Sequence, residues 1–217
     1  MNDNTPLKKK QNESPGAREP LPIVVLISGR GSNLQAIIDA AGRDLPVNIR
    51  AVISNRAGAL GLERARLAGI ETVTLEHTSF PSREAFDAAL ESLIEGFGPR
   101  LVVLAGFMRV LTPAFVSHFA GRLINIHPSL LPQLPGLDTH ERAIAARFKE
   151  HGASVHFVTE EVDAGPIIIQ ARVPVLADDT PETLAARVLV QEHRILPQAI
   201  RWFVEDKFPL TANGDRA

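Results

Sequence analysis

Two polar side chains, Asn125 and His127, alternate with isoleucines in the stretch at residues 123–132, which reads LINIHPSLLP. Residues two apart in a strand point to the same face, so Asn125 and His127 would lie side by side. Pro128 has no backbone donor and cannot continue a central strand, which places His127 at the strand's carboxyl end. Open α/β sheets bind ligands at that end, and an imidazole there can move protons near neutral pH. We therefore expect a functional site; the alternative is a strand end that happens to carry two polar residues.

A histidine that moves protons needs an orienting partner, and Asp163 is the candidate. It lies in the turn-rich segment EVDAGP at 161–166, where Gly165 and Pro166 would fix the backbone. Such a turn could carry the carboxylate across to His127. Aspartate is also a common turn former, so an ordinary turn remains the alternative.

The other histidines suggest no metal site. Four of them are expected to be solvated on surface helices or turns: His77, His118, His140 and His151. His156 alternates with apolar residues on a predicted strand and could be a satisfied core histidine or a support for the site. No pair has the spacing of zinc ligands, so we expect no bound metal.

A glycine-containing loop, SGRGSN at 28–33, separates the first predicted strand from the first predicted helix. Its glycines permit a tight turn, and the helix N-terminus offers free amides to an anion. Leu34 takes the third glycine position of a dinucleotide fingerprint, and no acidic residue ends the next strand. Arg56 keeps a phosphorylated dinucleotide open as an alternative, and a plain tight turn is another. A single phosphate fits better, held by the amides and hydroxyl of Gly31, Ser32 and Asn33.

Strands and helices alternate from residue 22 onward, which predicts the scaffold that would position these residues. The predicted strands lie at 22–28, 47–55, 71–75, 100–107 and 122–127. The predicted helices lie at 32–43, 60–69, 82–97 and about 112–120. Runs such as PIVVLIS are typical of strands buried on both faces. The alternation predicts a parallel, doubly wound sheet with right-handed crossovers.

The second part of the chain changes this pattern. Its predicted elements are a helix at 139–150, strands at 153–159 and 167–175, and a closing helix at 180–205. Thr180 and Pro181 suit the N-cap and first position of the closing helix. Two consecutive strands predict an antiparallel addition, so the fold class is α/β, Rossmann-like and mostly parallel. We expect one domain at 21–207, between a disordered tail at 1–20 and a C-terminal tail at 208–217.

Composition narrows the class of protein. The chain has 217 residues, 45% of them hydrophobic, and a formal net charge of -2. This net charge does not indicate the basic surface that is typical of nucleic-acid-binding proteins. Cysteine is absent, which excludes disulfides and thiolate chemistry and suits a reducing compartment. The apolar runs are too short to span a bilayer. We expect a cytoplasmic monomer or homodimer without nucleic-acid or membrane partners.

Three segments, in this order and spacing, resemble the phosphoribosylglycinamide formyltransferase family. They are VVLISGRGSNLQAIID, AGFMRVLTPAFVSHFAGRLINIHPSLLPQLPG and HGASVHFVTEEVDAGPIIIQARVPV. The resemblance extends from residue 22 to about 205 and implies the formyltransferase type of Rossmann-like fold. It also implies transfer of a formyl group from 10-formyltetrahydrofolate to the amino group of glycinamide ribonucleotide, in purine (IMP) biosynthesis.

The resemblance assigns roles to particular residues. The catalytic residues would be Asn125, His127 and Asp163. The ribonucleotide would be held by the phosphate loop and one distant acid, that is, by Gly31, Ser32, Asn33 and Glu192. The folate would be bound by Arg83, Met108, Arg109, Val110, Leu111 and Asn125.

The chemistry of formyl transfer suits these roles. An amine that attacks a formyl group forms a tetrahedral adduct whose oxyanion needs fixed donors. The Asn125 amide and a protonated His127 would supply them, and the imidazole would relay protons. Asp163 would orient the ring and raise its basicity. No covalent enzyme intermediate is required.

Two departures from the family pattern leave the shape of one loop open. Leu134 stands where many members have an aromatic residue, and Asp138 where a histidine is common.

Three alternative functions remain. A methionyl-tRNA formyltransferase would carry a further basic C-terminal domain, and a 10-formyltetrahydrofolate hydrolase an N-terminal regulatory domain. A non-catalytic nucleotide-binding module would leave Asn125, His127 and Asp163 unexplained.

Overall fold

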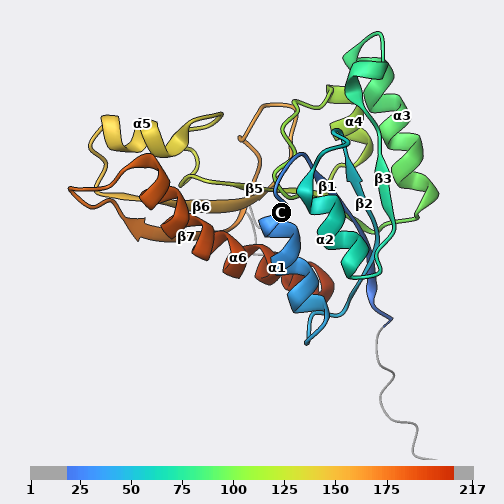
Figure 1. Ribbon diagram of the computed structural model, residues 1–217, viewed down its shortest axis with the longest axis horizontal. Coiled ribbons are helices and arrows are strands. Elements are labelled where there is room, and N and C mark those ends of the chain that lie inside the picture. The colour runs from blue at the N-terminus through green and yellow to red at the C-terminus, as the bar shows by residue number, and fades with distance from the viewer. Residues whose placement is uncertain (1–18, 208–217) are drawn as a thin grey trace, which may run out of the picture.

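The computed structural model describes residues 19–207, in which seven strands form one sheet (Figure 1). The strands are β1 (Leu21–Ile27), β2 (Val47–Ser54), β3 (Thr72–Thr74), β4 (Leu101–Leu104), β5 (Leu123–His127), β6 (Glu150–Phe157) and β7 (Ile167–Pro174). The helices are α1 (Ser32–Ala41), α2 (Leu60–Leu67), α3 (Arg83–Gly96), α4 (Pro113–His118), α5 (Thr139–Ala145) and α6 (Pro181–Glu205). A 3-10 turn, η1 (His77–Ser79), precedes α3.

The sheet has the order β3-β2-β1-β4-β5-β6-β7. The pairs from β3 to β5 are parallel, whereas β5 with β6 and β6 with β7 are antiparallel. This arrangement confirms the predicted mostly parallel sheet with an antiparallel addition. It also brings the carboxyl ends of β1, β4 and β5 next to one another, because these three strands are neighbours.

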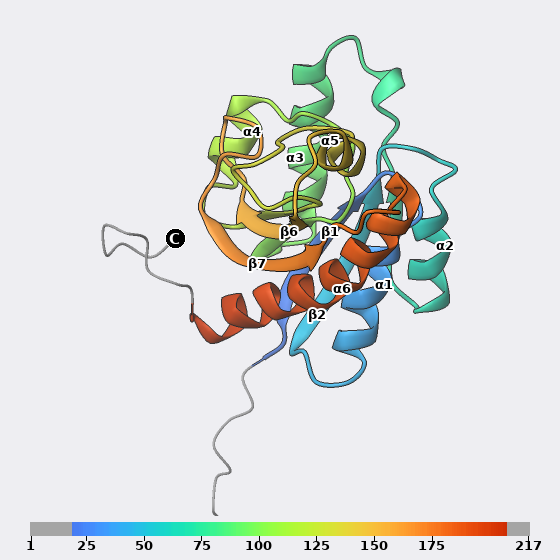
Figure 2. The ribbon, with the colours of Figure 1, turned by 90° about the vertical axis from the view of Figure 1, so that its left-hand side faces the viewer.

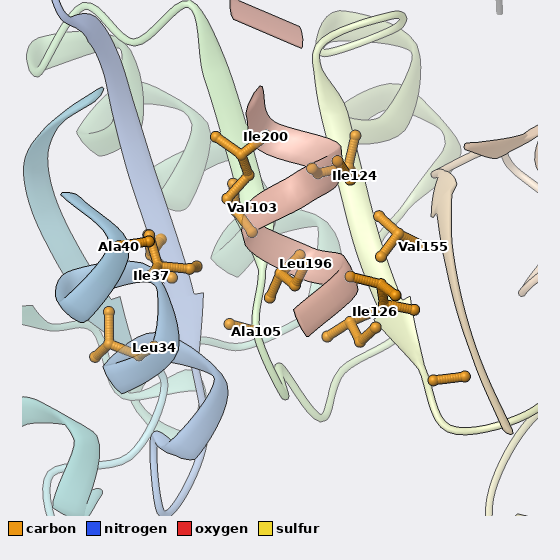
Figure 3. Close-up of a cluster of buried hydrophobic side chains, with 14 of the residues drawn as sticks. Leu34, Ile37, Ala40, Val103, Ala105, Ile124, Ile126, Val155, Leu196 and Ile200 are labelled. Carbon is orange, nitrogen blue, oxygen red and sulfur yellow. The ribbon is translucent and has the colours of Figure 1, made fainter. Parts of the chain in front are cut away.

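Helices cover both faces of the sheet, which explains the continuous apolar runs in its strands. On one face, Ile23 and Val25 of β1 join a buried cluster. Figure 3 shows other members of this cluster, among them Ile37 of α1 and Leu196 of α6. On the other face, Val24 and Leu26 join a cluster that includes residues of α3 and α4. Figure 2 shows α6 running beside α1 across the first face.

The boundary between α5 and β6 differs from the prediction. The helix expected at 139–150 ends at Ala145, Arg147 has a positive φ of 54°, and β6 already begins at Glu150. The local sequence is helical in pattern, but pairing with β7 extends the strand, with His151 opposite Val173. Gly152 permits that pairing, because a Cβ there would collide with the carbonyl of Ala171.

The closing helix α6 begins as predicted. The Thr180 hydroxyl accepts a hydrogen bond from the Thr183 amide at 3.3 Å, and Pro181 occupies the first turn. Apart from Glu19 and Pro20, which lie outside any helix or strand, the predicted tails at 1–20 and 208–217 fall outside the described residues. Within 19–207, no helix is long and apolar enough to cross a membrane.

Candidate active site

The site residues predicted from sequence gather around the carboxyl ends of β1, β4 and β5. The loop at 28–33 follows β1, the segment Met108 to Leu111 follows β4, and His127 is the last residue of β5. The chain adds β2 and β3 on one side of β1 and the later strands on the other side, so the strand order reverses between β1 and β4. Ligands of open α/β sheets bind in the crevice that forms at such a reversal. The fold therefore places the candidate residues where a ligand site is expected.

His127 and Asp163 are brought into contact, as the sequence predicted. His127 is 6% exposed, and its Nδ1 lies 3.4 Å from Oδ2 of Asp163. Its Nε2 lies 3.0 Å from the carbonyl oxygen of Leu134. Since a carbonyl can only accept, Nε2 carries the proton of the neutral ring and leaves the Nδ1 lone pair on the side of the carboxylate.

Asp163 is held by its own backbone as well as by its neighbours. Its φ of 56° lies in the left-handed region, where aspartate and asparagine are tolerated better than most residues. Its Oδ2 accepts a hydrogen bond from the Gly136 amide at 2.8 Å, and its Oδ1 lies 3.6 Å from Nε2 of His156. Burial alone would raise the pKa of this carboxyl, but His156, the Gly136 amide and His127 together lower it.

His156 is the residue whose role the sequence left open. It is 1% exposed and stands opposite Asn125 in the antiparallel pairing of β5 with β6. Its Nδ1 donates to the carbonyl of Phe157 at 2.8 Å, so its Nε2 accepts from Nδ2 of Asn125 at 3.2 Å. His156 therefore orients the Asn125 amide, and its Nε2 lies 3.6 Å from Oδ1 of Asp163 without a proton to donate to it.

Burial governs the charge of His127. It lowers the pKa of the ring, while the Leu134 carbonyl and the Asp163 carboxylate oppose it to a smaller extent. Burial therefore favours the neutral ring in the unliganded protein. The expectation that a protonated His127 acts on the adduct concerns the reacting complex and stays a prediction. The expected effect of Asp163 on basicity is present, but desolvation outweighs it.

The glycine loop forms the N-terminus of α1. Gly31 is its N-cap, with a φ of 69°, and the amides of the first helical turn have no partner within the helix. A Cβ on Gly31 would lie 2.5 Å from Cα of Gly61, so this glycine also lets α2 pack closely against the loop. The sequence predicted free amides here but not this packing role.

Asn33 and Glu192 meet although 159 residues separate them in the chain. Nδ2 of Asn33 donates to Oε2 of Glu192 at 2.6 Å, and both residues are buried. Burial raises the pKa of Glu192, and the bond from Asn33 opposes that shift. A hollow of about 540 Å³ between α1 and α6 reaches Ser32 at one end, but neither Asn33 nor Glu192 lines it.

The segment predicted to bind folate presents apolar side chains to solvent. Met108 is 59% exposed and Val110 is 52% exposed, whereas Leu111 is buried. The guanidinium of Arg109 lies over the ring of Phe86, 4.9 Å from its centroid. Arg83, at the start of α3, is exposed and lines a cavity of about 250 Å³ that also reaches Thr112. None of Met108 to Leu111 lines that cavity, but Arg83 lies on the same helix as Phe86, which Arg109 contacts.

The loop whose shape the sequence left open is now defined. Leu134 and Asp138 both have positive φ, 54° and 56°, and Asp138 is the N-cap of α5. Close to this loop, the rings of His140 and His151 meet edge to face, with their centroids 5.2 Å apart. His151 is 1% exposed, so its expected surface position is wrong, because β6 is an interior strand of the sheet.

Within 19–207, no three histidine, aspartate or glutamate side chains converge as metal ligands.

Comparison with known proteins places this fold and site in a class. The sequence profile of the family described as formyl transferase matches residues 21–200. Phosphoribosylglycinamide formyltransferase of Escherichia coli strain K12 is 58% identical over 193 residues, which cover 88% of this chain and 91% of that protein. The human trifunctional purine biosynthetic protein adenosine-3 is 45% identical over 193 residues, 88% of this chain but 19% of that larger protein.

Solved structures agree. The phosphoribosylglycinamide formyltransferase of Coxiella burnetii has a TM-score of 0.85 at 55% identity, covering 91% of this chain and 99% of that one. Glycinamide ribonucleotide transformylase 1 of Symbiobacterium toebii has a TM-score of 0.87 at 48% identity, covering 92% and 95%. Fold and site thus define a formyltransferase. More narrowly, the chain belongs to the phosphoribosylglycinamide formyltransferase family, the folate-dependent formyltransferases of purine biosynthesis.

Proposed function

We propose that the chain moves the formyl group of 10-formyltetrahydrofolate directly to the amino group of glycinamide ribonucleotide, at the carboxyl end of β5. One observation carries the proposal. The contacts from Asn125 through His156 and Asp163 to His127 join a fixed amide donor to a buried, neutral base. That combination suits addition of an amine to a formyl carbon, which needs both a donor for the oxyanion and an acceptor for a proton.

Asn125 stabilises the adduct. One hydrogen of its Nδ2 is used by His156, which holds the amide in place, and the other is available to the oxygen of the formyl group. A donor fixed in advance needs no reorganisation when negative charge develops on that oxygen. Asn125 thereby favours the tetrahedral adduct over the bound substrates.

His127 takes up the proton that the attacking nitrogen must lose. The neutral ring is able to accept it at Nδ1, and the resulting imidazolium is then balanced by Asp163 and by the Leu134 carbonyl. The same proton goes to the folate nitrogen as the carbon–nitrogen bond breaks, which regenerates the neutral ring. Proton uptake and return balance, so no covalent enzyme intermediate is needed.

The binding residues lie on either side of this centre. The ribonucleotide phosphate rests on the amides of Gly31, Ser32 and Asn33, and the buried Glu192 accepts from hydroxyls of its ribose. The folate lies along the segment Met108 to Leu111, with Arg83 and Arg109 as the cations for its carboxylates. Support comes from the exposed apolar side chains of that segment and from the free amides of α1.

Four further properties complete the proposal. The reaction needs no metal ion, since His127, His156 and Asp163 are engaged with one another and with backbone carbonyls. The protein works in the cytoplasm as a monomer or homodimer without nucleic-acid or membrane partners. Residues 21–207 form the catalytic domain, and 1–20 and 208–217 are dispensable tails. Activity after exhaustive chelation, gel filtration with light scattering, and assays of truncated chains test these points.

Replacement of His127 tests the proposed chemistry. His127→Ala should lower kcat by roughly two to four powers of ten, the range for general acid–base groups, while the affinities for both substrates stay close to wild type. His118→Ala is the matched control, because His118 is exposed on α4 and its ion pairs go to α3. Equal turnover in the two variants would remove His127 from the mechanism. Folate turnover without the ribonucleotide would favour a hydrolase instead.

A further inference from the structure

The segment Met108 to Leu111 has no regular secondary structure, yet it is tied down at both ends by buried side chains. At one end, the hydroxyl of Ser28 accepts a hydrogen bond from the Met108 amide at 2.7 Å. At the other, Oδ2 of Asp87 accepts one from the Thr112 amide at 2.6 Å. Both bonds reach across the fold, because Ser28 follows β1 and Asp87 lies on α3.

Ser28 is itself held by a residue that follows another strand, β2. It is 4% exposed, and its hydroxyl donates to Oδ1 of Asn55, which follows β2, at 2.6 Å. The single hydroxyl hydrogen is therefore directed at Asn55, which leaves the oxygen lone pairs to the Met108 amide. This arrangement fixes the start of the segment relative to the ends of β1 and β2.

Asp87 holds the other end in a similar way. It is 2% exposed on the buried face of α3, one turn beyond Arg83. Because Thr112 is the N-cap of α4, the bond to its amide sets where the segment stops and α4 starts. Between the two ends, Arg109 lies over Phe86, the residue before Asp87. One helix thus supports both the middle and the end of the segment.

We propose that Ser28 and Asp87 are positioning residues that hold the segment Met108 to Leu111 in the shape that binds the folate. The inference rests on the proposed contact between that segment and the folate. Neither residue touches a substrate in this scheme. Each acts through a backbone amide, so that the exposed Met108 and Val110 meet the ligand without an ordering cost at binding.

Steady-state kinetics with both substrates varied tests the inference. Asp87→Ala and Ser28→Ala each leave a backbone amide at one end of the segment without its acceptor, so the KM for 10-formyltetrahydrofolate should rise about tenfold. The KM for glycinamide ribonucleotide should stay within about twofold of wild type. Asp87→Asn keeps an acceptor oxygen and should recover most of the folate affinity, which a general loss of stability would not predict.

Two control variants lie near these residues; Ser54 also matches Ser28 in burial, whereas the Glu91 side chain is 33% exposed. Ser54 is a fully buried serine at the end of β2, and its hydroxyl hydrogen-bonds with the backbone of Arg56. Glu91 lies one turn beyond Asp87 on α3 and faces His118 of α4. Ser54→Ala and Glu91→Ala should leave both KM values within about twofold of wild type.

The possible results distinguish the positioning role of Ser28 and Asp87 from the proposed contact between the segment and the folate. Val110→Asp places a charge on the exposed part of the segment, so an unchanged folate KM would overturn the folate contact and the inference together. If Val110→Asp raises the folate KM while Asp87→Ala and Ser28→Ala match their controls, only the positioning role is wrong. Equal rises for both substrates would also overturn it. Should Asp87→Ala fail to fold, Ser28→Ala tests the other end alone.

Discussion

Asp163→Asn removes the negative charge beside His127 with little other change. The residue has a φ of 56°, and asparagine adopts this left-handed conformation readily, so the turn keeps its backbone. The side-chain oxygen of asparagine can still accept the hydrogen bond from the Gly136 amide. What is lost is the charge 3.4 Å from Nδ1 of the ring.

The size of the effect follows from that distance. Two unit charges about 3.4 Å apart attract by about 5 kcal/mol at an effective dielectric constant of about 20. Loss of an attraction of this size would lower a rate by at most between three and four powers of ten, near the upper end of the range for acid–base groups. His127 is neutral in the free protein, so the attraction arises only when the ring gains its proton. The loss should therefore fall on kcat and leave both KM values nearly unchanged.

The assay is steady-state formyl transfer with either substrate varied, supported by circular dichroism to show that the variant is folded. Asp138→Asn is the matched control, because Asp138 also has a φ of 56° and lies at the N-terminus of α5. A loss of less than about tenfold in kcat for Asp163→Asn would refute the electrostatic argument. A loss confined to KM would show that Asp163 binds substrate instead.

Three other predictions follow from single contacts. Glu192→Gln replaces the buried carboxyl group that accepts from Asn33, so the KM for the ribonucleotide should rise about tenfold while the KM for folate stays unchanged; both are measured by steady-state kinetics. His156→Phe removes the acceptor that orients the Asn125 amide, so kcat should fall about tenfold or more in the same assay. Burial lowers the pKa of His151 to about 4, so the unfolded chain takes up its proton first as the pH falls below the ordinary value of 6.5. His151 should therefore remove about 2 kcal/mol from the free energy of unfolding between about pH 7.5 and pH 5, and His151→Phe should flatten this dependence in urea titrations.

Strand periodicity and local signals were sufficient to predict much of the site. Asn125 and His127 are two residues apart and are followed by a proline. This local pattern predicted that both lie at the end of a strand, as they do in β5. Thr180 and Pro181 marked the start of α6 in the same local way. These features depend on residues within a few positions of one another, so the sequence contains them directly.

Features that depend on packing between distant segments were not predictable. The helix pattern at 139–150 ends early because β7 pairs with the following residues, and only the folded sheet supplies that partner. The bond between Asn33 and Glu192 joins residues 159 positions apart, and the part played by His156 depends on the register of β6 against β5. The neutral state of His127 reflects burial, which residue types alone do not give.

The central claim is that His127 and Asp163 act as one proton-accepting unit, and a double-mutant cycle tests it most directly. The kcat values of His127→Ala, Asp163→Asn and the double variant are compared with wild type under saturating substrates. Residues that act together are strongly non-additive, so the double variant should be little slower than the slower single variant. Losses that multiply would show that the two residues act independently, and the contact between the end of β5 and the loop of Asp163 would have no catalytic meaning.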